Sequence, residues 1–65
     1  MDKPTILNVI ARQFIEEVES MGLEDNGDAQ DLILGELLTE HGLDIDDDYN
    51  EAIEVISQQL KEKGA

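Results

Sequence analysis

The stretch DAQDLILGELLTEHG, residues 28–42, decides the fold that this sequence predicts. Five of the seven residues from 32 to 38 are large and aliphatic: Leu32, Ile33, Leu34, Leu37 and Leu38. At about 100° per residue in an α-helix, they occupy three different faces. A helix that is apolar almost all round is usually buried. We therefore expect a central helix over residues 28–41, packed by its neighbours on several sides, with a contact to a second chain as the alternative.

Two further helices are predicted on either side of this segment, over residues 4–21 and 48–63. In the first, apolar residues step by three or four positions and form one stripe: Leu7, Ile10, Phe14, Val18 and Met21. In the second, the expected core face carries Tyr49, Ala52, Ile53, Ile56 and Leu60. The fold class is therefore all-α, a small three-helix bundle in a single acidic domain over residues 1–65.

The expected ends of the helices follow from short signals. Gly22 and Gly42 are each followed by leucine, the pattern of a Schellman motif, in which glycine takes the left-handed conformation and the leucine folds back on the last turn. Asp28 and Asp48 are the expected N-caps of the following helices, with Asp31 and Glu51 three residues on as capping-box partners.

The length and composition predict a marginally stable cytoplasmic protein. A chain of 65 residues buries only about 60% of its unfolded surface, so a partner subunit would add stability. There is no cysteine, which fits a reducing compartment. We expect no membrane segment, because no apolar run reaches the required length of about 18 residues. The N-terminal region turns acidic too soon for a signal peptide.

The charge is strongly negative and unevenly distributed. Seventeen Asp and Glu residues against four Lys and Arg give a net charge of −13. Between Gln13 and Leu60 there are fifteen acids and no Lys or Arg. Such a stretch repels nucleic acid and anionic membranes, and it attracts cations or a basic protein surface. The alternative is that the acids only keep the protein soluble.

Several kinds of chemistry are poorly supported. Asp44, Asp46 and Asp48 match the start of an EF-hand calcium loop, but its sixth and twelfth positions hold Tyr49 and Val55 instead of Gly and Glu. The single histidine, His41, has no nucleophile partner in the sequence, and no Gly-rich phosphate loop occurs. We therefore expect neither an enzyme nor a cofactor or metal site, and no direct binding of nucleic acid.

The function that we expect is that of a small acidic protein-binding module. Acids along helices can imitate the charge of a DNA backbone and block the basic groove of a nucleic-acid-binding protein. Short, acidic chains without a cofactor are typical of phage and mobile-element inhibitors of host nucleases, polymerases or defence complexes. The candidate contact residues form two groups: Asp44, Asp46, Asp47, Asp48, Glu51 and Glu54, and then Glu24, Asp25, Asp28 and Asp31.

The alternative is a structural or adaptor module that acts through apolar helix surfaces. In this hypothesis the excess aliphatic surface of residues 28–41, together with Ile6 and Val9, forms a homodimer contact, and the acids serve solubility. Binding that survives about 0.5 M salt would favour this alternative, because exposed charges are then largely screened.

Repulsion among the carboxylates leads to a prediction about salt. Added NaCl screens like charges and should favour the folded chain, so the melting temperature should rise from low to moderate salt. Thermal unfolding followed by circular dichroism over a series of NaCl concentrations measures this effect. A melting temperature that falls with added NaCl would contradict the assumption that net repulsion weakens the fold.

Overall fold

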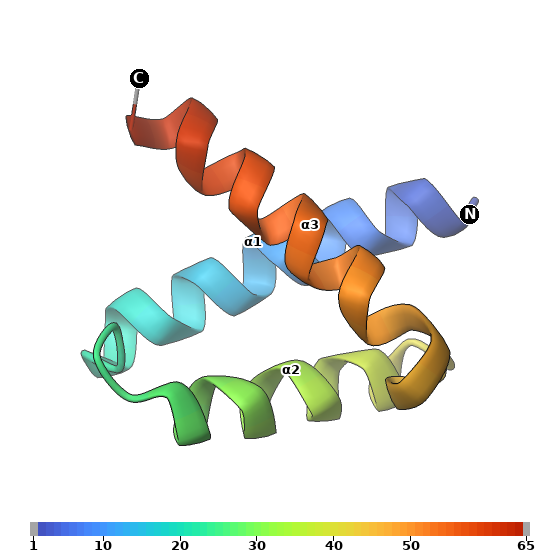
Figure 1. The fold of residues 1–65 in the computed structure, drawn as a ribbon, viewed down its shortest axis with the longest axis horizontal. Coiled ribbons are helices and arrows are strands. Elements are labelled where there is room, and N and C mark those ends of the chain that lie inside the picture. Colours follow the sequence, from blue (N-terminus) through green and yellow to red (C-terminus); the bar gives the residue numbers. More distant parts are fainter. Residues whose placement is uncertain (1, 65) are drawn as a thin grey trace.

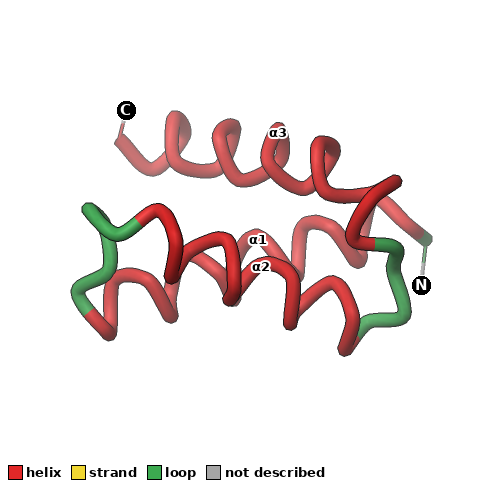
Figure 2. Tube along the Cα trace, turned by 60° about the horizontal axis from the view of Figure 1, so that its bottom comes forward, coloured by secondary structure: helices red, strands yellow, loops and turns green. Residues whose placement is uncertain are grey.

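Three helices connected by two short loops make up the fold. The computed structural model describes residues 2–64, and its helices are α1 (Lys3–Met21), α2 (Gly27–Glu40) and α3 (Ile45–Gly64). The two loops lie at opposite ends of the bundle, so α2 runs back along α1. The third helix, α3, begins beside the end of α2 and crosses α1 (Figure 1, Figure 2). The all-α three-helix prediction is confirmed. Within residues 2–64, no helix is long and apolar enough to cross a membrane.

The apolar core is dominated by α1. Twelve apolar residues are buried, and α1 supplies six of them: Leu7, Ile10, Ala11, Phe14, Ile15 and Val18. From α2 come Ile33, Leu34, Leu37 and Leu38, and from α3 come Ala52 and Ile56. The most extensive packing is between α1 and α3. The structure therefore does not show the predicted central position of residues 28–41.

Leu32 shows that α2 is not packed on all the sides that its apolar residues predicted. Its exposed fraction is 66%, whereas the other four large aliphatic side chains of α2 are buried. In a bundle of three helices, each helix touches two others and turns its remaining side to water. The faces of α2 that carry Ile33 and Leu34 meet the neighbouring helices, and Leu32 lies on the outer side.

Both glycine stop signals are confirmed. Gly22 and Gly42 have φ angles of 69° and 75°, in the left-handed region. The amide of Leu23 donates to the carbonyl of Val18 at 2.9 Å, and the amide of Leu43 donates to that of Leu38 at 2.8 Å. Leu23 and Leu43 both pack against the core. Each loop is thereby fixed to the helix that it follows.

The predicted starts of the second and third helices were wrong. The N-cap of α2 is Asn26, whose side-chain oxygen accepts a hydrogen bond from the Ala29 amide at 3.2 Å, and Asp28 already lies in the first turn. The third helix begins at Ile45, three residues before the predicted start at Asp48. Aspartate and asparagine are both good N-caps, and several stood close together in each loop. The path of each loop decided which of these residues caps the helix that follows.

Part of the predicted apolar faces is also exposed. In α3, Ile53 and Leu60 are 38% and 49% exposed, and Met21 at the end of α1 is 62% exposed. The C-terminal half of α3 runs away from α2 (Figure 1), so Leu60 has no helix on that side. Ile6 and Val9, expected as a surface patch, are half-buried, and Ile6 packs against the core.

Two leucines of α2 provide a matched test of this core. Leu38→Ala removes a side chain with 0% exposure and should lower the free energy of unfolding by about 2–5 kcal/mol. Leu32→Ala removes the same atoms from the outer side, and its effect should stay within about 0.5 kcal/mol. Urea unfolding followed by circular dichroism compares the two. Similar losses for both variants would contradict this placement of α2.

Candidate functional site

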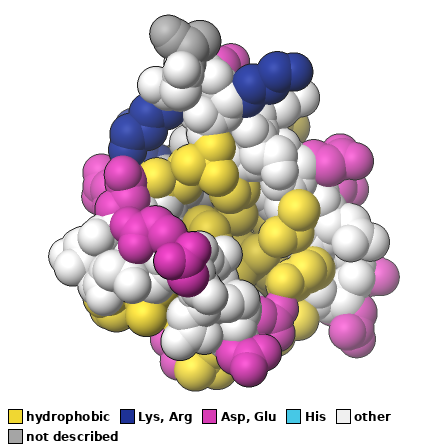
Figure 3. All heavy atoms as spheres, turned by 60° about the vertical axis from the view of Figure 1, so that its left-hand side comes forward, with side chains coloured by type: hydrophobic (Ala, Val, Ile, Leu, Met, Phe, Trp, Pro, Cys, Tyr) yellow, Lys and Arg dark blue, Asp and Glu magenta, His cyan; other side chains and the backbone are white. Residues whose placement is uncertain are grey.

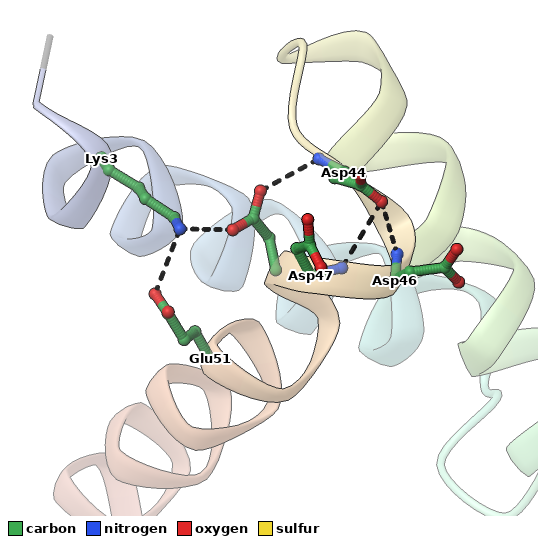
Figure 4. Close-up of polar contacts among 6 residues, drawn as sticks. Lys3, Asp44, Asp46, Asp47 and Glu51 are labelled. Atoms are coloured by element: carbon green, nitrogen blue, oxygen red, sulfur yellow. Dashed lines mark hydrogen bonds and ion pairs between the residues drawn. The ribbon is translucent and has the colours of Figure 1, made fainter.

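The first group of candidate acids surrounds the beginning of α3 (Figure 4). One carboxylate oxygen of Asp44, Oδ1, accepts hydrogen bonds from the amides of Asp46 and Asp47, at 2.8 and 3.4 Å. The amide of Asp44 in turn donates to Oδ2 of Asp48 at 3.0 Å. Asp44 and Asp48 thus form the reciprocal capping arrangement that the sequence analysis assigned to Asp48 and Glu51.

Asp48 is a structural residue of the α1–α3 contact. It is only 6% exposed, and its carboxylate forms an ion pair with Lys3 near the start of α1. The Lys3 ammonium also lies 3.6 Å from Glu51 (Figure 4). Hydrogen bonding to Lys3 and to the Asp44 amide lowers the pKa of Asp48, and the bond to Asp48 raises the pKa of Lys3. Asp48 is therefore poorly placed to touch a partner.

The second group lies around the loop between α1 and α2. Glu24 and Asp25 are exposed in this loop, and Asp28 is exposed in the first turn of α2. The side-chain amide of Gln30 holds the loop by donating to the carbonyls of Leu23 and Glu24, at 2.7 and 2.9 Å. The loop that follows α2 is at the other end of the bundle (Figure 2). Glu24, Asp25 and Asp28 are thus separated from the first group by the length of α2.

Asp31 connects α2 with α3. Its Oδ1 accepts a hydrogen bond from the Tyr49 hydroxyl at 2.5 Å, and this bond raises the pKa of Tyr49. The predicted role of Asp31 as a capping-box partner was wrong, since Asn26 caps this helix. Tyr49 is half-buried beside the core, as its predicted position on a core face suggested.

The acids are spread over all three helices, whereas the bases are confined to two of them. Sixteen of the seventeen acids are exposed, Asp48 being the exception. All four bases belong to α1 and α3, where Lys3 pairs with Asp48 and Lys63 pairs with Glu19. From Gly22 to Asp44, through both loops and α2, there are seven acids and no Lys or Arg. The α2 side is therefore negative along its whole length.

The outer face of α2 carries acids that lie outside both groups of candidate residues. It carries Glu36 and Glu40, one helical turn apart and both exposed. Like charges four residues apart destabilise a helix, and an acid in its last turn opposes the helix dipole. Gly35 precedes them in mid-helix, where glycine costs about 0.5–1 kcal/mol relative to alanine. Gly35 and the Glu36–Glu40 pair, within residues 35–40, are thus the signal in the sequence that marks this face.

A shallow groove of about 490 Å³ runs between this outer face and the start of α3. Its walls are formed by Asp31, Leu32, Gly35, Glu36, Thr39, Glu40, Ile45 and Tyr49. Leu32 and Ile45 are 66% and 47% exposed and face water. The groove therefore combines exposed apolar side chains with acids and contains no base.

Neither similarity to known proteins nor a metal site indicates the function. No family model, curated protein or solved structure matches the chain. Among residues 2–64, no three Asp, Glu or His side chains converge so that they could hold a metal ion. The charge and shape of the surface are therefore the features of the molecule that bear on its function.

Two neighbouring aspartates test the structural role of Asp48. Asp48→Asn and Asp47→Asn each remove one charge from the first turn of α3, but only Asp48 is buried beside Lys3. Asp48→Asn should therefore lower the urea midpoint more than Asp47→Asn does at neutral pH. Equal effects would mean that the ion pair adds nothing beyond the helix dipole.

The pH dependence gives a second readout of the same pair. The pKa of Asp48 is lowered from 3.8, so its contribution is complete above that pH and is lost as the pH falls through the folded value. The pKa of Lys3 is raised from 10.5, so its contribution is lost only as the pH rises through a more alkaline value. The stability difference between wild type and Asp48→Asn should be constant near neutral pH and shrink in acid.

Proposed function

We propose that this protein is a small acidic module that binds a basic protein surface. The partner in this proposal is a nucleic-acid-binding protein, such as a nuclease, a polymerase or a subunit of a defence complex. The module acts as an inhibitor by offering a DNA-like negative surface to the groove that would otherwise hold the nucleic acid. The observation that carries this proposal is the α2 side, which has seven acids and no base from Gly22 to Asp44.

The arrangement of the bases supports the proposal. Lys3 and Lys63 are held in ion pairs between α1 and α3, and Arg12 and Lys61 are exposed on those same two helices. The ion pairs between described residues therefore neutralise none of the acids of α2. A basic partner that approaches this side meets an uncompensated negative field, which accelerates association and makes binding strongly dependent on salt.

Some candidate contact residues suit this role better than others. Asp46, Asp47 and Glu54 are exposed on α3. Glu24 and Asp25 are exposed in the loop before α2, and Asp28 is exposed in its first turn. Asp44 and Asp48 are engaged in capping, and Asp48 is buried. Glu51 and Asp31 already have partners in Lys3 and Tyr49. To the exposed acids we add Glu36 and Glu40 on the outer face of α2.

The second candidate function is a homodimeric adaptor. Exposed Leu32 and Ile45 favour it, because apolar side chains in a shared groove can form a contact between copies. However, Asp31, Glu36 and Glu40 line the same groove. A symmetric contact there would bring like charges together, which disfavours self-association at low salt.

The proposal is tested by capturing partners with matched charge variants. One variant carries Asp25→Asn, Asp28→Asn, Glu36→Gln and Glu40→Gln on the α2 side. A control carries Asp2→Asn, Glu16→Gln, Glu17→Gln and Glu62→Gln, so both have four fewer negative charges than the wild type at −13. Each protein is immobilised, exposed to lysate of the source cells at about 50 mM NaCl, and eluted with a salt gradient.

The expected result is one nucleic-acid-binding protein, retained in stoichiometric amount by the wild type and the control. Duplex DNA added to the column should release it, because the two compete for one basic surface. The α2-side variant should retain much less of it. A broad mixture of basic proteins that elutes early, or equal retention by the two variants, would overturn the proposal and leave the acids a role in solubility.

A further inference from the structure

The groove between α2 and α3 has the form of a receptor for apolar side chains. Gly35 forms part of its wall, and a Cβ built on Gly35 would lie 3.8 Å from Cδ1 of Ile45, at ordinary contact distance. The absence of a side chain at this position therefore keeps the groove open beside Ile45. Tyr49 forms another part of the wall and is held in place by its hydrogen bond to Asp31.

The charged residues of the groove are all acidic. Asp31, Glu36 and Glu40 line it, and the other lining residues are apolar or neutral. From Asp31 to Glu40 the helix rises about 14 Å, at 1.5 Å per residue. That length matches the spacing of anchors at positions i, i+3, i+4 and i+7 of a bound helix, whose first and last lie about 10 Å apart.

We propose that this groove binds a cationic amphipathic helix of the partner protein. One or two apolar side chains of that helix lie against Leu32, Gly35 and Ile45, and its Lys or Arg residues lie near Asp31, Glu36 and Glu40. This inference rests on the proposed function for the basic nature of the partner, and it adds a defined apolar anchor. Charge complementarity favours such a helix over a second copy of this chain, which has a net charge of −13 and would place the same three acids of its own groove in a symmetric contact.

The local sequence of α2 supports this use of the groove. Gly35, Glu36 and Glu40 each disfavour the helix in which they occur, while Leu32 and Ile45 leave apolar surface in water. Departures of this kind tend to gather at functional sites, because the surrounding structure compensates for them. None of these five residues belongs to the buried core of the bundle.

Synthetic peptides and two variants of Gly35 test this inference. The first peptide is a 14-residue helix of Leu, Lys and Ala, with Leu at i, i+3, i+4 and i+7. The second has the same composition in scrambled order, without an apolar stripe. Gly35→Met fills the groove without changing the charge, and Gly35→Ala is the matched control, since a Cβ fits there. Met and Ala both favour helix over Gly, so folding should be preserved. Fluorescence anisotropy at about 150 mM NaCl measures each affinity.

The wild type should bind the striped peptide at least about ten-fold more tightly than the scrambled one, the effect of burying a large apolar side chain. Gly35→Met should abolish this preference, and Gly35→Ala should retain it. Leu32→Gln, at an exposed position, should weaken only the striped peptide. Equal binding of both peptides by the wild type would overturn the groove inference but leave charge-driven binding intact.

Two other outcomes would also be decisive. Failure to bind either peptide, even at about 20 mM NaCl, would contradict the proposed function together with the groove, since exposed charges are then least screened. Sedimentation of the wild type as a dimer that Gly35→Met dissociates would instead assign the groove to a contact between copies of this chain.

Discussion

The structure depends above all on the apolar stripe along α1. Its six buried residues make up half of the apolar core, and both other helices pack against it. Because the core is so small, it has room for few polar groups, and Asp48 is the one charged residue buried among residues 2–64. The remaining acids must face water. Their exposure is therefore first a consequence of packing, and any binding function uses a surface that packing has already created.

The arrangement of the helices gives the charged residues two different roles: some form ion pairs between α1 and α3, and the acids of α2 face water without a base nearby. Lys3 pairs with Asp48 near the starts of α1 and α3, and Lys63 pairs with Glu19 near their ends, so part of the charge supports the bundle. The α2 side lies away from these pairs and carries no base. Figure 3 shows an apolar hollow at the end where α3 leaves the bundle, with acidic side chains at its sides and below it and basic side chains at its upper edge. An apolar surface bordered by acids thus occurs at this end as well, where Leu60 is half exposed beside Phe14.

The outer face of α2 carries both acidic and exposed apolar side chains. Acids alone would attract any cation, and apolar side chains alone would favour self-association. They occur together in one groove, with Gly35 between Leu32 and Glu36. In the proposed function, this groove would select for a partner that is both basic and amphipathic. Such a combination supplies specificity through contact geometry and a fast approach through charge. The proposed role would also account for a helix that contains both the strongest apolar run and residues that weaken it.

The sequence by itself determined the helix class, the number of helices and both glycine stops, because periodicity and left-handed glycine are local properties. It also determined the negative surface, since Lys and Arg are absent between Gln13 and Leu60. Only the tertiary structure decided that α1 dominates the core, that Leu32 faces water, and that Asp48 is buried beside Lys3. These features depend on which faces of the helices pack together. Lys3 and Asp48 form an ion pair although they are 45 positions apart in the chain, and no local sequence pattern predicts a contact over that separation.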